Sequence, residues 1–114
     1  MTAKIRIRQA EGTWVVRAGG AVIAESKKAK ELSEDGYEDV IYFPREDVGM
    51  VLLDNSSHTS HCPHKGDASY FDIVTKSTTI KDAAWSYASA KEDVAEIDGH
   101  IAFYNRDQVT VEQL

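Results

Sequence analysis

Short apolar runs with a period of two residues recur along the chain, separated by turns that contain glycine or proline. Ile5 and Ile7 alternate with arginines, which is the pattern of a strand with one buried face. Residues 13–17 and 21–24 flank Gly19-Gly20, and glycine supplies the positive φ of a two-residue hairpin turn. No strand–helix–strand alternation interrupts this pattern. The sequence therefore predicts a mainly β domain with mainly antiparallel strands.

Further short segments extend the predicted sheet. The predicted strands cover residues 40–43, 50–53, 68–75, 78–80, 83–87, 100–104 and 109–111. Pro44 cannot donate to a sheet ladder, so the strand before it ends there and residues 44–47 are expected to form a single helical turn. Residues 26–36 are predicted to be a turn or a short helix, and the aperiodic residues 54–66 a loop.

One helix is expected near the carboxyl end. Ser89 and Glu92 have the spacing of a capping box, in which the two side chains satisfy free amides at a helix start. A short C-terminal helix from about Ala90 to Ile97, closed by Gly99, follows from this spacing. The whole chain, residues 1–114, is expected to be one domain, an antiparallel sandwich or half-barrel with this helix added.

Charge and cysteine content narrow the classes of partner. Thirteen Lys and Arg against nineteen Asp and Glu give a net charge of -6, which opposes attraction to phosphate backbones or anionic lipid. We therefore expect neither a nucleic-acid nor a membrane partner. The single cysteine cannot form an internal disulfide, and the first residues lack the apolar segment of a signal peptide. These features favour a cytoplasmic protein and leave its oligomeric state open.

The densest group of reactive side chains lies between residues 58 and 65. One interpretation is a thiol enzyme, with Cys62, Lys65 and His58 as catalytic candidates, because a nearby cation lowers the pKa of a thiol. A second is a metal site made by Cys62 with His58, His61 or His64. Zinc motifs usually have two separated ligand pairs, and only one further histidine is present, so no metal is expected. A third is a buried structural thiol among solvated histidines.

Three other segments carry weaker signals. Arg45 could grip a carboxylate or phosphate, or form an exposed ion pair with Asp47. Gly66 could allow a sharp turn, although the spacing of a phosphate-binding loop is absent. Trp85 and Tyr87 would share a strand face and could form either the wall of a pocket or part of the core.

These segments together resemble one protein family. The similar segments are residues 42–48 (YFPREDV), 58–70 (HTSHCPHKGDASY), 83–87 (AAWSY) and 102–104 (AFY). They resemble the family catalogued as domain of unknown function 427, which some catalogues label nucleotidyltransferase-like. The resemblance implies a compact β-tent fold, similar to methionine sulfoxide reductase B and the thalidomide-binding domain of cereblon. It does not supply a reaction, and because this chain has one cysteine, the structural zinc of relatives with paired Cys-x-x-Cys motifs does not carry over.

The resemblance also singles out particular positions. The family pattern points at Tyr42, Arg45, Asp47, Thr59, Cys62, Lys65, Gly66, Tyr70, Trp85 and Tyr104. The chain departs from the pattern at His64, where an aromatic residue such as tyrosine is expected, and at residues 88–89, where a proline is common. The predicted ligand-binding set is these ten positions and His64.

The leading hypothesis is a pocket that binds a small anionic or polar ligand. Arg45 and Lys65 would take the charge of the ligand, and Trp85 and Tyr70 would form the walls. The alternatives are a thiol- or metal-dependent enzyme that uses Cys62 with a neighbouring histidine, and a protein-interaction module without catalysis. No cofactor is expected, and the sequence leaves open whether any reaction is catalysed.

Overall fold

The computed structural model describes residues 4–106 and 108–114, in which ten strands form two antiparallel sheets. The strands are β1 (Ile5–Gln9), β2 (Trp14–Ala18), β3 (Ala21–Ser26), β4 (Lys30–Glu34), β5 (Val40–Phe43), β6 (Leu53–Cys62), β7 (Gly66–Val74), β8 (Thr79–Ser86), β9 (Ile101–Phe103) and β10 (Val109–Gln113). A seven-stranded sheet has the order β1-β4-β5-β9-β8-β7-β6, and a three-stranded sheet has the order β10-β2-β3. The prediction of a mainly β, antiparallel fold is confirmed.

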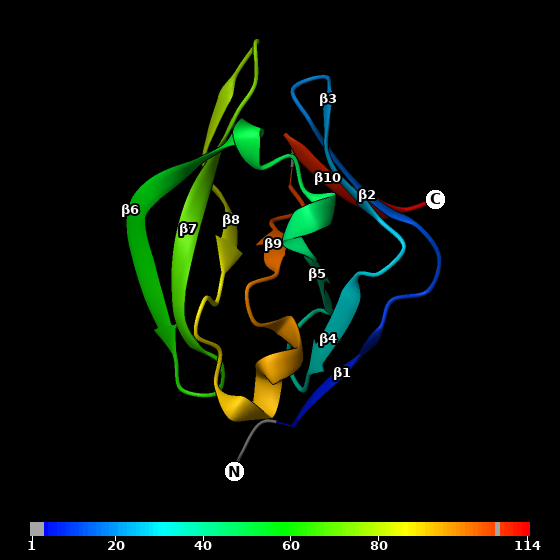
Figure 1. The fold of residues 1–114 in the computed structure, drawn as a ribbon, viewed down its shortest axis with the longest axis vertical. Helices are drawn as coiled ribbons and strands as arrows, with labels where there is room; N and C mark the ends of the chain where they lie inside the picture. The colour runs from blue at the N-terminus through cyan, green and yellow to red at the C-terminus, as the bar shows by residue number, and fades with distance from the viewer. Residues whose placement is uncertain (1–3, 107) are drawn as a thin grey trace.

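The two faces of the seven-stranded sheet are covered differently. One face packs on the three-stranded sheet, and the core between them contains Phe43 and Phe71 from the large sheet and Val16 and Ile23 from the small one. The large sheet curls so that β6 and β7 face β4 and β1 across the molecule, with the 3-10 helix η3 (Glu92–Ile97) between them at one end (Figure 1). The second face is therefore covered only in part.

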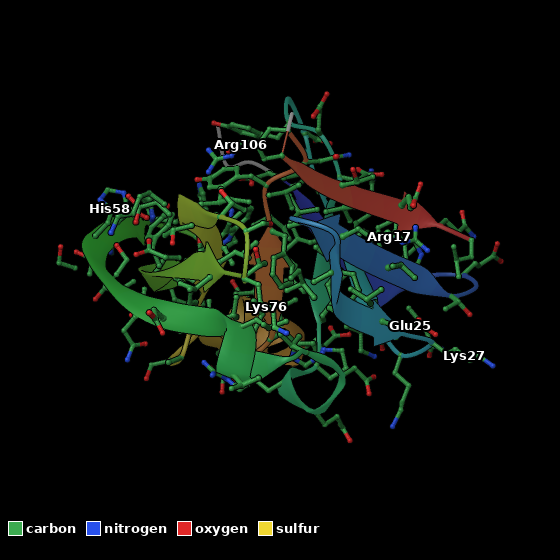
Figure 2. The ribbon with its side chains drawn as sticks, turned by 90° about the horizontal axis from the view of Figure 1, so that it is seen from above. Arg17, Glu25, Lys27, His58, Lys76 and Arg106 are labelled. Atoms are coloured by element: carbon green, nitrogen blue, oxygen red, sulfur yellow. The ribbon has the colours of Figure 1, made fainter. Side chains whose placement is uncertain are left out.

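The outer face of the small sheet is solvated. Arg17 on β2 and Glu25 on β3 are exposed and project outward (Figure 2). The hairpin between these strands turns at Gly19 and Gly20 with φ of 56° and 77°, as its sequence predicts. Trp14 at the start of β2 packs at the edge of the core and donates its indole N–H to a backbone oxygen.

Three segments differ from their prediction. Residues 30–34 form β4 rather than a turn or helix, because β1 and β5 pair with both of its edges. Residues 50–52 form the 3-10 helix η2 (Met50–Leu52) rather than a buried strand, and Val51 is 92% exposed. Residues 54–62, expected to be a loop, belong to β6. This edge strand bonds to β7 but buries only Leu53, so it shows no apolar periodicity.

The helical segments are all short. The turn after Pro44 is present as η1 (Arg45–Asp47), and the predicted C-terminal helix is present as the 3-10 turns of η3. The capping-box prediction was wrong: Lys91 is the N-cap residue and makes no side-chain cap, while Asp98 accepts the Ala90 N–H at 2.8 Å. No helix in the described part of the chain is long and apolar enough to span a membrane.

Strand β7 has a register shift on each side at nearly the same level. On one side, β6 shifts between Asn55 and Thr59, so that three of its residues oppose Tyr70 alone. On the other side, Asp72 opposes three residues of β8. Extra residues on both neighbours bend the sheet around β7. This bend contributes to the curl that gives the second face its concave shape.

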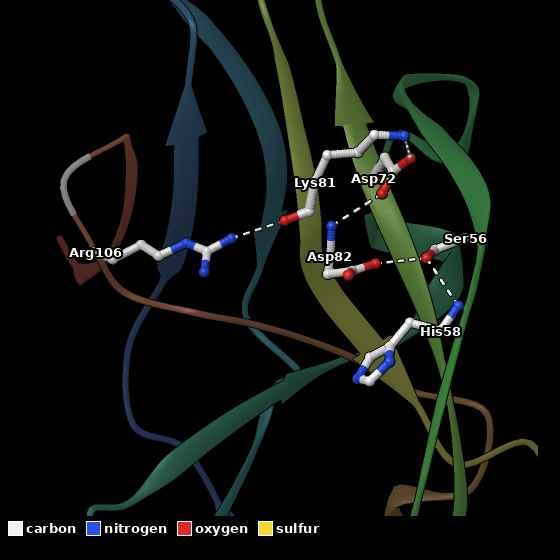
Figure 3. A network of polar contacts seen from close by, with 6 residues as sticks. All are labelled: Ser56, His58, Asp72, Lys81, Asp82 and Arg106. Atoms are coloured by element: carbon white, nitrogen blue, oxygen red, sulfur yellow. Dashed lines mark hydrogen bonds and ion pairs between the residues drawn. The ribbon is translucent and has the colours of Figure 1, made fainter.

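A network of polar contacts holds the two shifts together (Figure 3). The buried carboxylate of Asp72 accepts the Asp82 N–H at 2.9 Å and the Lys81 Nζ at 3.1 Å. Asp82 has a positive φ of 50°, and its carboxylate accepts the hydroxyl of Ser56. Ser56 Oγ in turn accepts the His58 N–H at 3.0 Å. The Asp82 N–H hydrogen bond, followed by the hydrogen bond and charge of Lys81, holds the pKa of Asp72 below its usual range.

We expect Asp72→Ala to lower the free energy of unfolding by about 1–3 kcal/mol at neutral pH, because two hydrogen bonds to a buried carboxylate are lost. The matched control is Asp54→Ala, since Asp54 pairs with Asp72 in register but is exposed, and its effect should stay within about 0.5 kcal/mol. Urea denaturation measures both values.

The same substitution has a defined pH dependence. Because the pKa of Asp72 is depressed in the fold, its contribution is present above the unfolded pKa of about 4 and is lost as the pH falls through the folded value. The difference between wild type and Asp72→Ala should therefore shrink at acidic pH. A difference that is unchanged well below pH 4 would show that the ionised carboxylate is not its source.

Candidate functional site

A row of register partners crosses the second face of the large sheet. Tyr70 on β7 pairs with Trp85 on β8, Trp85 pairs with Ala102 on β9, and Ala102 pairs with Tyr42 on β5. Direct partners in antiparallel strands point to the same face, so these side chains stand side by side. Because Ala102 is small, Trp85 reaches over it and donates its Nε1–H to the Tyr42 hydroxyl at 3.3 Å. The two rings meet edge to face at 6.4 Å.

Two more tyrosines extend this aromatic row. Tyr87 and Tyr104 follow members of the row by two positions and line the same cleft, and the Trp85 and Tyr104 rings lie 4.6 Å apart. At the outer end His58 lies against Tyr70, with ring centroids 4.4 Å apart. The rings of Tyr70, Trp85 and Tyr104 are thus partly exposed on this face, and those of Tyr42 and Tyr87 are buried next to them.

This surface forms the wall of an open cleft of about 870 Å³. The cleft is lined by Leu32, Glu34, Gly36, Tyr37, Glu38, Val40, Tyr42, Cys62, Pro63, His64, Lys65, Tyr70, Trp85, Tyr87 and Tyr104. Its volume is within the range of pockets that hold small molecules. Lys65 Nζ lies 3.0 Å from Glu34 Oε1, and their side chains are only 12% and 10% exposed. With Glu38 as a second carboxylate, the cleft is weakly acidic.

Three tyrosines of the cleft have raised pKa values. Burial raises the pKa of Tyr42 and of Tyr87 above the ordinary range of a phenol. Burial, followed by a hydrogen bond with Tyr70, raises the pKa of Tyr104 to about 12. These groups are therefore neutral across physiological pH, and they can donate and accept hydrogen bonds in the cleft.

The turn that carries Cys62 and Lys65 is fixed from behind. The Lys65 N–H donates to the Cys62 carbonyl at 3.2 Å, and the Lys65 carbonyl accepts the Lys91 N–H at 3.0 Å. Gly66 has a φ of 115°, and a Cβ at this position would lie 3.3 Å from the Ser89 carbonyl oxygen. Gly66 thus allows this turn to pack against the segment before η3.

The structure brings seven of the predicted ligand-binding residues into the cleft. They are Tyr42, Cys62, His64, Lys65, Tyr70, Trp85 and Tyr104. The predicted ligand-binding set did not include Glu34, Glu38 or Tyr87, which also line the cleft, although Tyr87 was considered as a possible pocket wall. The spacing of Tyr87 from Trp85 was a usable signal, because residues two apart on a strand share a face. The two glutamates belong to an acidic stretch that has no such pattern.

The other predicted positions lie outside the cleft. Arg45 Nε donates to the Gly99 carbonyl at 2.9 Å, and Asp47 accepts the Ser26 hydroxyl at 2.6 Å, so the two do not pair with each other. Thr59 is exposed on β6. Gly66 is buried behind the turn. Arg45 therefore does not line the cleft that contains Lys65, and the two side chains do not share this surface.

The histidines do not gather around the thiol. Cys62 is a half-buried free thiol at the end of β6, and His64 lines the cleft with it. His61 Nδ1 lies 2.6 Å from the Asp67 carboxylate, and His58 is at the bend of β6 against the aromatic row. Within residues 4–106 and 108–114, no group of three or more His, Cys, Asp or Glu side chains could hold a metal ion.

The fold and the site define a small antiparallel β domain with an aromatic, weakly acidic cleft on the open face of its larger sheet. A family model described as a domain of unknown function (DUF427) matches residues 6–113. The chain therefore belongs to the domain of unknown function 427 family, which confirms the resemblance carried by its motifs. No curated protein matches it.

The buried tyrosines predict a loss of stability in alkaline solution. A raised folded pKa means that the folded state binds more protons than the unfolded state above about pH 10, so the free energy of unfolding falls as the pH rises. Tyr42→Phe should reduce this slope, because it removes one such group. Urea denaturation of both proteins between about pH 8 and pH 11 measures the difference, and equal slopes would contradict the assignment.

Proposed function

We propose that this protein is a small-molecule binding domain whose cleft holds a polar ligand with a planar or ring-shaped body. The observation that carries the proposal is the group of Tyr70, Trp85 and Tyr104, which line the cleft and stay partly exposed, while Tyr42 and Tyr87 beside them are buried. Tyr104 is 38% exposed, and Trp85 is half-buried. Large rings open to solvent in a concave site are typical of binding surfaces, since a ligand can bury them.

Polar groups beside the rings would orient such a ligand. The neutral hydroxyls of Tyr42, Tyr87 and Tyr104 can each donate or accept a hydrogen bond. The Glu34–Lys65 pair adds a carboxylate and an ammonium group within the same cleft. A few polar groups placed in a mainly aromatic site are the usual basis of ligand specificity.

Catalysis has less support from the geometry. No hydrogen bond joins the Cys62 thiol to a histidine in the described ranges, and His61 is instead paired with Asp67. Nucleotidyl transfer would place a triphosphate next to Glu34 and Glu38. Repulsion between these negative charges disfavours such binding. The single cysteine supports our proposal that the domain works in the reducing cytoplasm.

The position of Cys62 provides a direct test. Because it is the only cysteine and lines the cleft, a compound that occupies the cleft should slow its alkylation by a neutral reagent at constant pH. A library of polar aromatic metabolites and fragments is screened for this protection. We expect protecting compounds, and their affinity should fall about two- to tenfold in Tyr104→Ala, because a stacking partner is lost.

The matched control is Arg45→Ala, which changes a residue singled out by the family resemblance but located outside the cleft. It should leave the affinity of a protecting compound unchanged, and circular dichroism checks that both variants are folded. If no compound protects Cys62, or if Arg45→Ala weakens binding as much as Tyr104→Ala, the cleft is not the binding site.

A further inference from the structure

A second hollow adjoins the cleft, and the two share a set of lining residues. The second hollow has a volume of about 480 Å³, and four residues line both it and the cleft. They are Glu38, Val40, Trp85 and Tyr104, and we call them the junction. A ligand that extends from the cleft into the second hollow must pass these four side chains.

The junction combines two aromatic rings with a free carboxylate. The rings of Trp85 and Tyr104 are 4.6 Å apart and inclined at 45°, so they form a corner rather than a stack. In the part of the chain that the structure describes, the exposed Glu38 carboxylate makes no ion pair or hydrogen bond with another side chain. Aromatic faces next to a carboxylate attract organic cations.

The same attraction operates within the protein. The guanidinium carbon of Arg106 lies 5.1 Å from the centroid of the Tyr104 ring, and its NH2 group donates to the Lys81 carbonyl at 2.9 Å. This arrangement is a cation–π contact on Tyr104. Arg106 is exposed, so water and salt screen its repulsion of a second cation at the junction.

The charges around the two hollows also favour a cation. The carboxylates that line them are Glu31, Glu34, Glu38 and Asp39, and among the described residues the only lysine or arginine that lines either hollow is Lys65. Lys65 is paired with Glu34. Arg8, which lines neither hollow, lies 2.9 Å from Glu31 Oε1 and 3.9 Å from Asp39 Oδ2. After this pairing, Glu38 carries the charge that is left without a close partner at the junction.

We propose that the ligand of this cleft is an organic cation, with its ammonium or guanidinium group held at the junction by the Glu38 carboxylate and the rings of Trp85 and Tyr104. This inference rests on the proposed function and names its ligand class. The remaining body of the ligand lies along the aromatic row, where the tyrosine hydroxyls bind its polar groups. An anionic ligand is the opposing case, because it would need Lys65 to leave Glu34.

Three probes with the same aromatic body test the charge of the ligand. Benzylamine is a cation at neutral pH, benzyl alcohol is neutral and benzoate is an anion. Binding is measured by the shift of the Trp85 indole N–H signal in nuclear magnetic resonance, assigned with Trp85→Phe, and by protection of Cys62. We expect benzylamine to bind at least about fivefold more tightly than benzyl alcohol, and benzoate to bind most weakly.

Two variants test the electrostatic origin of this selectivity. Selectivity is expressed as the dissociation constant of benzyl alcohol divided by that of benzylamine. A change in the cleft that affects both affinities equally leaves this ratio unchanged. Glu38→Gln should lower this ratio about three- to fivefold, because the attracting charge is removed. Arg106→Gln should leave it unchanged or raise it up to about twofold, because a like charge is removed. The affinity for benzoate should change in the reverse sense: Glu38→Gln should raise it, and Arg106→Gln should lower it or leave it unchanged.

The outcomes separate this inference from the proposed function. If benzyl alcohol or benzoate shifts Trp85 and protects Cys62 as well as benzylamine does, the cation assignment is overturned and the cleft remains a binding site. A ratio that Glu38→Gln leaves unchanged also overturns it. If none of the three probes binds, the inference fails, and the proposed function is then judged by the wider Cys62 protection screen alone.

Discussion

The hydrogen bond from the Asp82 N–H to the Asp72 carboxylate stabilises a bend in the large sheet. The bend leaves the alternation of side chains between the two faces of the sheet unchanged. At this point one residue of β7 opposes three of β8, and the backbone of Asp82 adopts a positive φ. A slip by one residue would turn every later side chain of β8 to the other face, whereas this insertion changes the register by two. Trp85 therefore still meets Tyr70 on the open face.

The cleft exists because the two faces of that sheet are filled unequally. The three-stranded sheet covers one face and shares a core with it that contains Phe43, Phe71 and Phe103. On the other face, Val94 and Ile97 of the short helix η3 form a smaller core with Tyr42 and Tyr87, and Tyr70 and Trp85 stay partly exposed beside it. The large rings further along this face shield one another, and the polar tips of the tyrosines satisfy the solvated side. These contacts limit the apolar area that the open face of the large sheet exposes to water, although no second sheet covers it.

The sequence predicted the strands that bury one face. It predicted few of the features that depend on contacts with residues distant in the sequence. Residues 5–9 and 40–43 alternate or run apolar because the core imposes that pattern on them. The edge strand β6 buries only Leu53, so its hydrogen bonds to β7 left no periodic signal. Arg45 was predicted to belong to the site because of its neighbours in the motif. In the structure its Nε donates a hydrogen bond to the carbonyl of Gly99, which is 54 positions away in the sequence.

The charge of the cleft shows the same limit most clearly. Read along the chain, the Cys-Pro-His-Lys-Gly segment is basic, and this favoured an anionic ligand. In the fold, β4 places Glu34 against Lys65, and both side chains are about nine-tenths buried. Freeing that lysine for a ligand anion would leave a buried carboxylate unpaired, which is costly. The net charge of the cleft is therefore set by Glu38, the glutamate that is not paired with Lys65. The sign of this charge depends on the ion pair between Glu34 and Lys65, which are distant in the sequence.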